Sequence, residues 1–366
     1  YAVPNMSKKI LTVRAVISPT DLGVTLMHEH IFLDLRKTHL PHPIVIDIKE
    51  LSQPINATAD FPATELALWE SKVGLGNLHM ARDWAPISDN YVLSDEHLAC
   101  TEVNEFKKYG GNTIVDVTSI GLNRDPKALR RLSETTGLNI VMGTGYYQPV
   151  YHPENMDDRS VDGLTDDIVS DVVIGVADTG IRAGLIGEIG VNGNPIIPNE
   201  VKSIAAASRA SRLTGAAISF HMGPGTNRHE TLNIAVDQGA ALDRIILGHS
   251  DEIASDLELM LSLLERGVYI EFDHMGRETA LGTPFGELAK TAMTHLVAAG
   301  HENRILLSHD VCMKIHLKHY GGNGYSFIPE KFLPYLLEKG ISSTQINKFM
   351  VDNPAKILQF VSPKPL

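Results

Sequence analysis

Two histidines near the start of the chain are spaced so that they could bind a metal ion together. His28 and His30 are separated by one residue in Leu26-Met27-His28-Glu29-His30, which follows a turn at 18–23 and a short apolar run. We interpret this segment as the end of a first strand, where side chains two residues apart point to the same face. The two imidazoles would then lie together, with Glu29 on the other face. Imidazole nitrogens are common metal ligands.

Further residues of metal-binding type follow four later apolar runs, each of which we interpret as a strand. Any one of them alone has a plain structural explanation as a cap or as a buried, hydrogen-bonded side chain. Their occurrence at the ends of separate strands indicates instead that they share one site. The residues are Glu188 in Gly187-Glu188-Ile189-Gly190, His221, His249 followed by Asp251, and Asp310 preceded by His309.

Four imidazoles and two carboxylates suit zinc, or manganese or iron of the same charge. Six ligands are too many for one catalytic ion that keeps an open position, but they fit two ions sharing a carboxylate and a hydroxide. Glu188 is the expected bridge, since it comes from the middle strand of the set and glycines flank it. His309 is expected to point away from the site by strand alternation. The six candidate ligands are His28, His30, Glu188, His221, His249 and Asp310.

The elements that must position these residues alternate between strand and helix. After the strand that ends at His30, apolar runs and turn residues predict seven strands. Each of the first six is followed by a helix, and the seventh by a helical tail at 329–360 with breaks near Gly340 and Asn353-Pro354. The strands are predicted at 113–118, 139–144, 183–189, 217–221, 244–249, 268–273 and 304–309. The helices between them are predicted at 126–136, 166–179, 199–213, 227–237, 254–265 and 285–299, with one more at 95–109 before the second strand.

Eight such units predict an α/β fold of the (β/α)8 TIM-barrel type, whose active site lies at the carboxyl ends of the strands. A doubly wound open sheet is the alternative, but no Gly-x-Gly-x-x-Gly sequence follows the first strand. Residues 7–366 are expected to form a single domain, since α/β barrels reach this size. Residues 1–5, which precede Met6, are expected to be an expression remnant.

A long segment after the first strand, residues 35–93, is rich in Pro, Asn, Asp and Ser. Structureless loops of this length are uncommon in compact domains and usually carry small elements or a function. We expect an insertion over the mouth of the barrel, with a short helix near 64–72. A peripheral decoration is the alternative.

Composition argues against some classes of partner and indicates a cellular compartment. The 32 basic and 44 acidic residues give a net charge of −12, which argues against nucleic acid and anionic membranes as partners. Cys100 and Cys312 provide no disulfide framework, so we expect a reducing cytoplasm, with Cys312 as a small packed side chain. No run approaches the ~20 apolar residues that span a bilayer. A small-molecule substrate is expected, and a homodimer is compatible with the sequence.

The chain resembles the phosphotriesterase family of the amidohydrolase superfamily from about residue 12 to residue 360. The resemblance rests on a set of short motifs spread over the whole chain. They are Met27-His28-Glu29-His30, Gly143-Thr144-Gly145-Tyr146-Tyr147, Ile186-Gly187-Glu188-Ile189-Gly190, His221, Gly248-His249-Ser250-Asp251, Phe272-Asp273-His274, Ser308-His309-Asp310 and Asn353-Pro354-Ala355.

We expect two divalent ions per chain, zinc in the first place, with manganese as the alternative. The resemblance implies that His28, His30 and Asp310 hold the more buried ion. His221 and His249 would hold the exposed ion. The two ions would lower the pKa of a shared water molecule and provide a hydroxide aimed at the substrate.

Roles can be suggested for five positions around the ions. Asp310 would touch both a metal ion and the hydroxide, and could take the proton of the nucleophile. Asp251 and His274 resemble the family's relay, which carries that proton to solvent. Tyr147, after the third strand, could hydrogen-bond the nucleophile or substrate, or simply pack. Arg277 could orient an acidic or oxygen-rich substrate, although a surface ion pair is the alternative.

One departure from the best-known family members bears on the substrate. Those organophosphate and lactone hydrolases bridge their metals with a carbamylated lysine, whereas this chain has Glu188 there, as in the phosphotriesterase homology proteins. We therefore expect hydrolysis of carboxylic esters or lactones, with weak phosphonate or phosphotriester hydrolysis as a side activity. The alternatives are a dedicated phosphotriesterase, a mononuclear deaminase of the same superfamily, and an inactive metal-binding barrel that acts as a binding protein.

Overall fold

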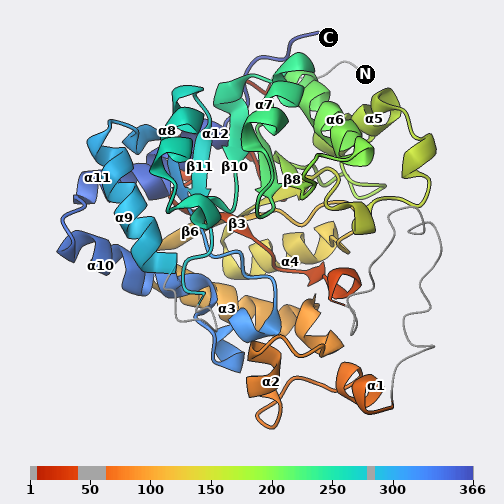
Figure 1. Ribbon diagram of the computed structural model, residues 1–366, viewed down its shortest axis with the longest axis vertical. Helices are drawn as coiled ribbons and strands as arrows, with labels where there is room; N and C mark the ends of the chain where they lie inside the picture. Colours follow the sequence, from red (N-terminus) through yellow and green to blue (C-terminus); the bar gives the residue numbers. More distant parts are fainter. Residues whose placement is uncertain (1–5, 40–62, 278–284, 366) are drawn as a thin grey trace.

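The predicted barrel is present in the computed structural model, which describes residues 6–39, 63–277 and 285–365 (Figure 1). Eight parallel strands form one sheet in the order β12-β11-β10-β9-β8-β7-β6-β3. In chain order these are β3 (Val24–Glu29), β6 (Gly111–Asp116), β7 (Asn139–Thr144), β8 (Leu185–Val191), β9 (Ile218–Met222), β10 (Ile245–Leu247), β11 (Tyr269–Phe272) and β12 (Ile305–Leu307). They follow the predicted strands closely.

The sheet closes on itself between its first and last strands. Just beyond the end of β12, the backbone N–H of Asp310 donates to the carbonyl of His28 at 3.0 Å, and that of His30 donates to the carbonyl of Val311 at 3.2 Å. The interior confirms the closure, because a single buried apolar cluster takes one side chain at or next to each of the eight strands. These are Met27, Val115, Val141, Leu185, Ala217, Ile246, Tyr269 and Leu306. The (β/α)8 prediction is therefore confirmed.

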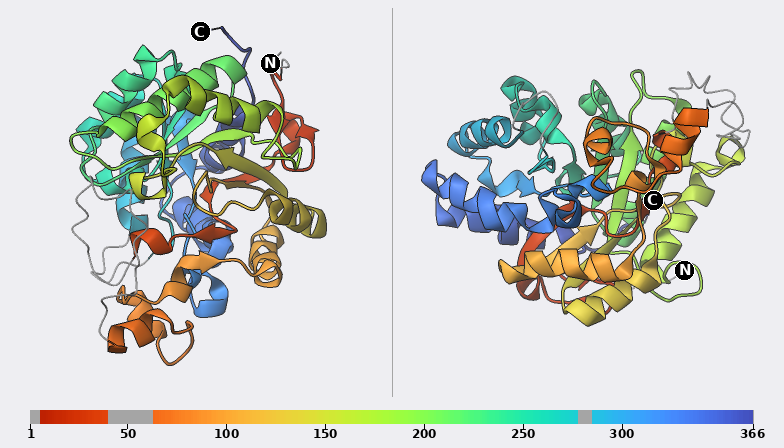
Figure 2. Two further views of the ribbon diagram at one scale, coloured as in Figure 1. Left: turned by 90° about the vertical axis from the view of Figure 1, so that its right-hand side faces the viewer. Right: turned by 90° about the horizontal axis from the view of Figure 1, so that it is seen from below.

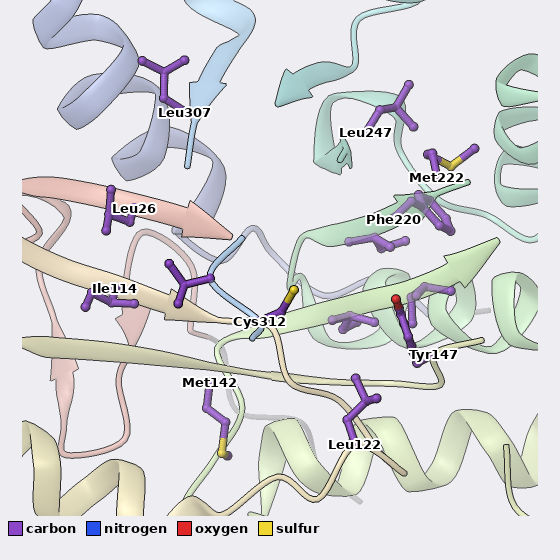
Figure 3. Close-up of a cluster of buried hydrophobic side chains, with 14 of the residues drawn as sticks. Leu26, Ile114, Leu122, Met142, Tyr147, Phe220, Met222, Leu247, Leu307 and Cys312 are labelled. Atoms are coloured by element: carbon purple, nitrogen blue, oxygen red, sulfur yellow. The ribbon is translucent and has the colours of Figure 1, made fainter. Parts of the chain in front are cut away.

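Helices surround the strands, as Figures 1 and 2 show. They are α3 (Glu96–Lys108), α4 (Pro126–Thr136), α5 (Val161–Val173), α6 (Pro198–Thr214), α7 (Arg228–Asp237), α8 (Leu257–Glu265) and α9 (Phe285–Ala298). Their apolar faces join the outward face of the strands in a second, larger cluster, part of which is drawn in Figure 3. Among the described residues, no helix is long and apolar enough to cross a membrane.

Both predicted ends of one helix, and one predicted helix break, were wrong. Helix α5 begins five residues before the predicted start, because Ser160 caps it by accepting the N–H of Gly163, and it ends before Gly175, whose φ is +124°. The predicted break at Asn353-Pro354 is not a break. The chain stays helical from α11 (Ser343–Asn347) through a π turn (Lys348–Asp352) into α12 (Asn353–Leu358).

The π turn explains why Pro354 does not end this helix. Proline lacks the N–H that an α-helix would use, and a π turn changes the hydrogen-bond register just before it. The break predicted near Gly340 is present, between α10 (Leu333–Glu338) and α11. There Gly340 has a φ of +93°, which favours glycine.

The insertion after β3 lies at the carboxyl-end side of the barrel, as far as it is described. Its base is the antiparallel pair β4 (Leu33–Asp34) and β5 (Val92–Leu93), and it holds α1 (Ala63–Trp69) and α2 (Leu78–Arg82). Helix α1 matches the helix predicted near 64–72, while residues 40–62 lie outside the described part. The insertion packs against the segment that follows β12, where Lys314 pairs with Asp89 at 2.8 Å.

Candidate metal centre

Two register shifts bring ligand-type side chains to the inside of the barrel. The β3–β6 pairing shifts between Leu26 and Glu29, and the β8–β9 pairing shifts between Ile186 and Ile189. Each shift adds one residue to the strand, so the side chain at the extra position changes face. His28 and Glu188 occupy these positions, and the Nε2 of His28 lies 3.3 Å from Oε2 of Glu188.

The first half of the cluster joins four buried side chains from three strands. His30 Nε2 lies 3.2 Å from Oε1 of Glu188 and 3.3 Å from Oδ1 of Asp310. The Nε2 of His28 is 3.9 Å from the same Asp310 oxygen. The other ring nitrogen of His30 lies 2.9 Å from the hydroxyl of Thr118, which fixes the orientation of the ring. This half can hold a small cation between two imidazoles and two carboxylates.

The second half shares Glu188 with the first. The Nδ1 of His221 lies 3.3 Å from Oε2 of Glu188 and 2.6 Å from the Nε2 of His249. One ligand atom from each of these three residues falls within 4.8 Å of the others, as it does for His28, His30 and Glu188. The structure therefore brings all six predicted ligands together, with the Glu188 carboxylate between the two halves.

The electrostatics and hydrogen bonding of this cluster suit bound cations. Burial alone would lower the pKa of His30, but Asp310 and Glu188 outweigh it and raise that pKa to about 9. Burial also lowers the pKa of His28, but the Asp273 and Glu188 carboxylates outweigh it and raise that pKa well above its usual value. The Nε2 of His28 and Oε2 of Glu188 are buried without a hydrogen-bond partner among the described residues. Two divalent ions would satisfy these atoms, so the donor set fits them.

The His249 and Asp310 backbones both adopt the left-handed region just after their strands end. Their φ values are +51° and +50°, a conformation that costs energy for residues other than glycine and that concentrates at functional sites. The turn swings the His249 ring toward His221, and it points the Asp310 carboxylate toward His30. The sequence does not predict this conformation, since neither residue is a glycine.

Two further carboxylates, which the ligand prediction did not include, lie behind the histidines. Asp273 Oδ1 is 2.8 Å from the Nδ1 of His249, and its Oδ2 is 3.3 Å from the Nδ1 of His28. Glu271 Oε2 is 3.5 Å from the same His28 nitrogen. Both acids are on or next to β11 and fully buried. Alternation along β11 could have indicated them, because Glu271 and Asp273 are two residues apart.

Tyr147 lies beside the second half of the cluster. Its hydroxyl is 3.3 Å from the Nδ1 of His221 and receives a hydrogen bond from Gln148 Nε2 at 3.1 Å. Burial, together with the Glu188 and Asp310 charges, raises the pKa of this tyrosine well above its usual value. In Figure 3 its ring and Cys312 lie among buried apolar side chains from several strands. Tyr147 thus both packs and reaches the centre.

Arg277 points into the centre rather than into solvent. Its Nη2 lies 2.5 Å from Oδ2 of Asp310 and also donates to the Asp310 carbonyl, while its Nε donates to the His309 carbonyl at 3.2 Å. Burial would raise the pKa of Asp310, but Arg277 and His30 outweigh it and hold that pKa well below its usual range. Arg277 therefore forms a largely buried ion pair with Asp310, and its part in orienting a substrate stays a prediction.

The two residues of the expected relay are placed differently. His274 is stacked on the His249 ring, and its Nε2 lies 3.8 Å from Oδ2 of Asp310. Asp251 instead supports the backbone, because its Oδ2 accepts the N–H groups of Asp273 at 2.7 Å and of His274 at 3.1 Å. Burial and the Asp273 charge raise the pKa of Asp251 to about 8. Asp251 therefore holds the His274 backbone in place.

His309 and Glu29 form a network on the outward side of the strands. Glu29 Oε1 accepts hydrogen bonds from the Ser308 hydroxyl at 2.8 Å and from the His309 backbone at 2.9 Å, and it lies 2.7 Å from the His309 Nδ1. Its Oε2 accepts the N–H of Val311. As expected, His309 faces away from the metal-type cluster. The network ties the end of β12 to β3 on both sides of Asp310.

A model of the phosphotriesterase family matches residues 8–358. The chain belongs to the phosphotriesterase family. A relative from Dictyostelium discoideum named N-acetyltaurine hydrolase is 33% identical over 365 residues, which cover 96% of this chain and 98% of that protein.

Solved structures of similar proteins agree with this membership. A resiniferatoxin-binding protein from Rhodobacter sphaeroides is 34% identical with a TM-score of 0.86, and the match covers 97% of this chain and 96% of that one. A lactonase from Listeria monocytogenes is 27% identical with a TM-score of 0.76, and the match covers 97% of this chain and all of that one (100%).

The family is binuclear and metal-dependent, and the clusters of His, Asp and Glu described above are suited to metal binding. This family member is a metal-dependent hydrolase.

Proposed function

We propose that this chain hydrolyses carboxylic acyl compounds, esters or lactones, using two divalent ions. The observation that carries the proposal is the cluster of four imidazoles and two carboxylates, with Glu188 between its halves. Two ions held there would activate a water molecule and polarise a carbonyl oxygen. Imidazole and carboxylate ligands favour zinc, with manganese as the second candidate. His28, His30 and Asp310 would hold one ion, and His221 and His249 the other.

The remaining chemistry falls to side chains of the barrel. Asp310 lies between His30 and Arg277, where its carboxylate can accept a proton from the attacking water. His274 is the candidate to take that proton onward, since its Nε2 is 3.8 Å from Asp310 and such contacts often tighten only when substrate is bound. Asp251 would act on this step through the backbone of His274. Tyr147 is placed to orient the substrate at the His221 side.

An attack on carbon is favoured over an attack on phosphorus for two reasons. A planar acyl group needs less space than a tetrahedral phosphotriester with three arms, and Tyr147, Gln148 and Arg277 crowd the centre. The activities named for two of the relatives, on a lactone and on N-acetyltaurine, also break a bond to a carboxylic acyl carbon.

A second candidate is an N-acyl amide that carries an anionic group. It is supported by Arg277, a largely buried cation at the centre whose present partner is a carboxylate, and by the relative named N-acetyltaurine hydrolase. A guanidinium can bind a sulfonate or carboxylate through two parallel hydrogen bonds. The two candidates share the centre and differ in the leaving group.

We expect the metal-loaded protein to hydrolyse an acyl compound faster than a phosphotriester. The test compares kcat/KM for nitrophenyl acetate, a set of lactones, N-acetyltaurine and a diethyl phosphotriester with the same nitrophenyl leaving group. A phosphotriester preferred by tenfold or more, which corresponds to about 1.4 kcal/mol of transition-state binding, contradicts the proposal. N-acetyltaurine as the best substrate selects the second candidate.

Replacing Arg277 with glutamine is expected to raise KM most for anionic substrates. A hydrogen bond to a charged group contributes about 1.5–3 kcal/mol, so KM for N-acetyltaurine should rise at least about tenfold. A neutral lactone provides the matched control, and its KM should change little. An equal loss with both substrates would mean that Arg277 serves only to hold Asp310.

A further inference from the structure

The Asp273 carboxylate contacts two imidazoles that belong to different halves of the metal cluster. It follows directly after β11, and both of its oxygens are used. Oδ1 lies 2.8 Å from the Nδ1 of His249, whereas Oδ2 lies 3.3 Å from the Nδ1 of His28 and accepts the backbone N–H of His249 at 2.9 Å. One buried acid therefore contacts both halves, on the Nδ1 side of the two imidazole rings.

These contacts favour Nε2 as the metal-binding nitrogen of each ring, through a hydrogen bond at His249 and, at His28, through the nearby carboxylate charge, since the His28 Nδ1 makes no hydrogen bond with the described residues. A carboxylate beside Nδ1 keeps a proton on that nitrogen and leaves the lone pair of Nε2 for a ligand. In both rings Nε2 is the nitrogen that faces the cluster. The Nε2 of His28 is 3.3 Å from Glu188, and that of His249 is 2.6 Å from the Nδ1 of His221.

The backbone around Asp273 is built for this close approach. The Asp273 N–H donates to Oδ2 of Asp251 at 2.7 Å, which fixes the start of the turn. Gly248 leaves the space that the carboxylate needs, since a Cβ there would lie 3.1 Å from Oδ2 of Asp273 and 3.4 Å from the Nδ1 of His28. A side chain at 248 would push the acid and the imidazole apart.

The two histidines differ in what remains if the Asp273 carboxylate is removed. His28 keeps Glu271, whose Oε2 lies 3.5 Å from its Nδ1 and whose two oxygens make no hydrogen bond with the described residues. Within the described part of the chain, the His249 Nδ1 has no second carboxylate within 4.0 Å. The half formed by His221 and His249 therefore depends on Asp273 more strongly than the half formed by His28 and His30.

We propose that Asp273 is a positioning residue shared by both halves, that the His221–His249 half relies on it alone, and that Glu271 is the reserve partner of His28. This inference rests on the proposed binuclear centre. It predicts that the two ions respond differently to two substitutions of similar size. Carboxylates that support metal-binding histidines typically change metal affinity by about 10–100-fold when they are removed.

The experiment titrates Co²⁺ into the metal-free wild-type chain, Asp273→Asn, Glu271→Gln and the double variant, in metal buffers. Bound metal and the cobalt absorption spectrum are read together. The wild type should hold two ions. Asp273→Asn should hold one at free metal concentrations where the wild type holds two, with the affinity for the second ion reduced about 10–100-fold. Glu271→Gln should keep both, and the double variant should weaken both.

Several outcomes overturn the proposal. One is an Asp273→Asn chain that binds two ions with wild-type affinity and spectrum, and another is a Glu271→Gln chain that loses the same ion as Asp273→Asn. A wild type that binds fewer than two ions contradicts the binuclear centre itself. This outcome distinguishes failure of the proposed function from failure of the Asp273 proposal alone. Thermal unfolding of the metal-free chains detects a variant that does not fold, and Asp273→Ser, which keeps an oxygen acceptor, then takes its place.

Discussion

Replacing Asp310 with asparagine should lower kcat by at least about 10³-fold, because loss of a positioned acid–base group alone typically costs 10²–10⁴-fold and a metal ligand is weakened as well. The asparagine side chain keeps the shape of the aspartate but carries no charge for His30, 3.3 Å away, or for Arg277, 2.5 Å away. Asparagine also tolerates the left-handed backbone found here, where φ is +50°. The fold should therefore survive while the chemistry is lost.

The measurement is steady-state kinetics on a nitrophenyl ester, with metal content determined on the same sample. Asp125→Asn is the matched control, since Asp125 caps α4 by accepting the N–H of Ala128 and asparagine caps helices equally well. It should retain wild-type kcat and metal. If Asp310→Asn keeps its metal and loses less than tenfold in kcat, the carboxylate is not the proton acceptor.

The strand pattern was enough to predict the barrel and the grouping of the six metal-type residues. Apolar runs and turn residues fix which segments are strands, and parallel strands in a closed barrel bring their carboxyl ends to one place. The pattern could not show to which face of the strand the side chains around His28 and Glu188 point. Strict alternation along β3 would place Met27 outward, yet Met27 lies in the interior cluster, because the register shift lets two successive residues face inward.

The sequence also could not assign the carboxylates that support the centre. Asp251 follows His249 closely and resembles a relay residue, but its side chain is used by the backbone N–H groups of Asp273 and His274. Such a role depends on a turn in a distant loop and has no local signature. Glu271 and Asp273 share a face of β11, but nothing in the chain indicates which histidine each acid meets. The partnership emerges only when the closed barrel brings the carboxyl ends of β3, β10 and β11 together.

The substitution with the largest expected effect on metal content is at Glu188. Its two oxygens contact three imidazoles, with His30 on Oε1 and both His28 and His221 on Oε2. Burial would raise the pKa of this carboxyl, but His28 and His221 outweigh it and hold the pKa well below its usual range, so the group stays charged. A negative charge between two cations offsets their mutual repulsion. Without it, two ions cannot be held close together at comparable affinity.

Glu188→Gln separates this charge from the volume of the side chain. We expect metal content to fall from about two ions to one or fewer per chain and kcat/KM to fall by roughly 10³-fold, on the scale typical of removing a strong electrostatic contribution to catalysis. Glu188→Ala should behave alike, because the charge and not the packing is what the ions require. Elemental analysis after metal loading provides the measurement. Should Glu188→Gln keep two ions and full turnover while Glu188→Ala loses both, the residue fills space and the bridging role is wrong.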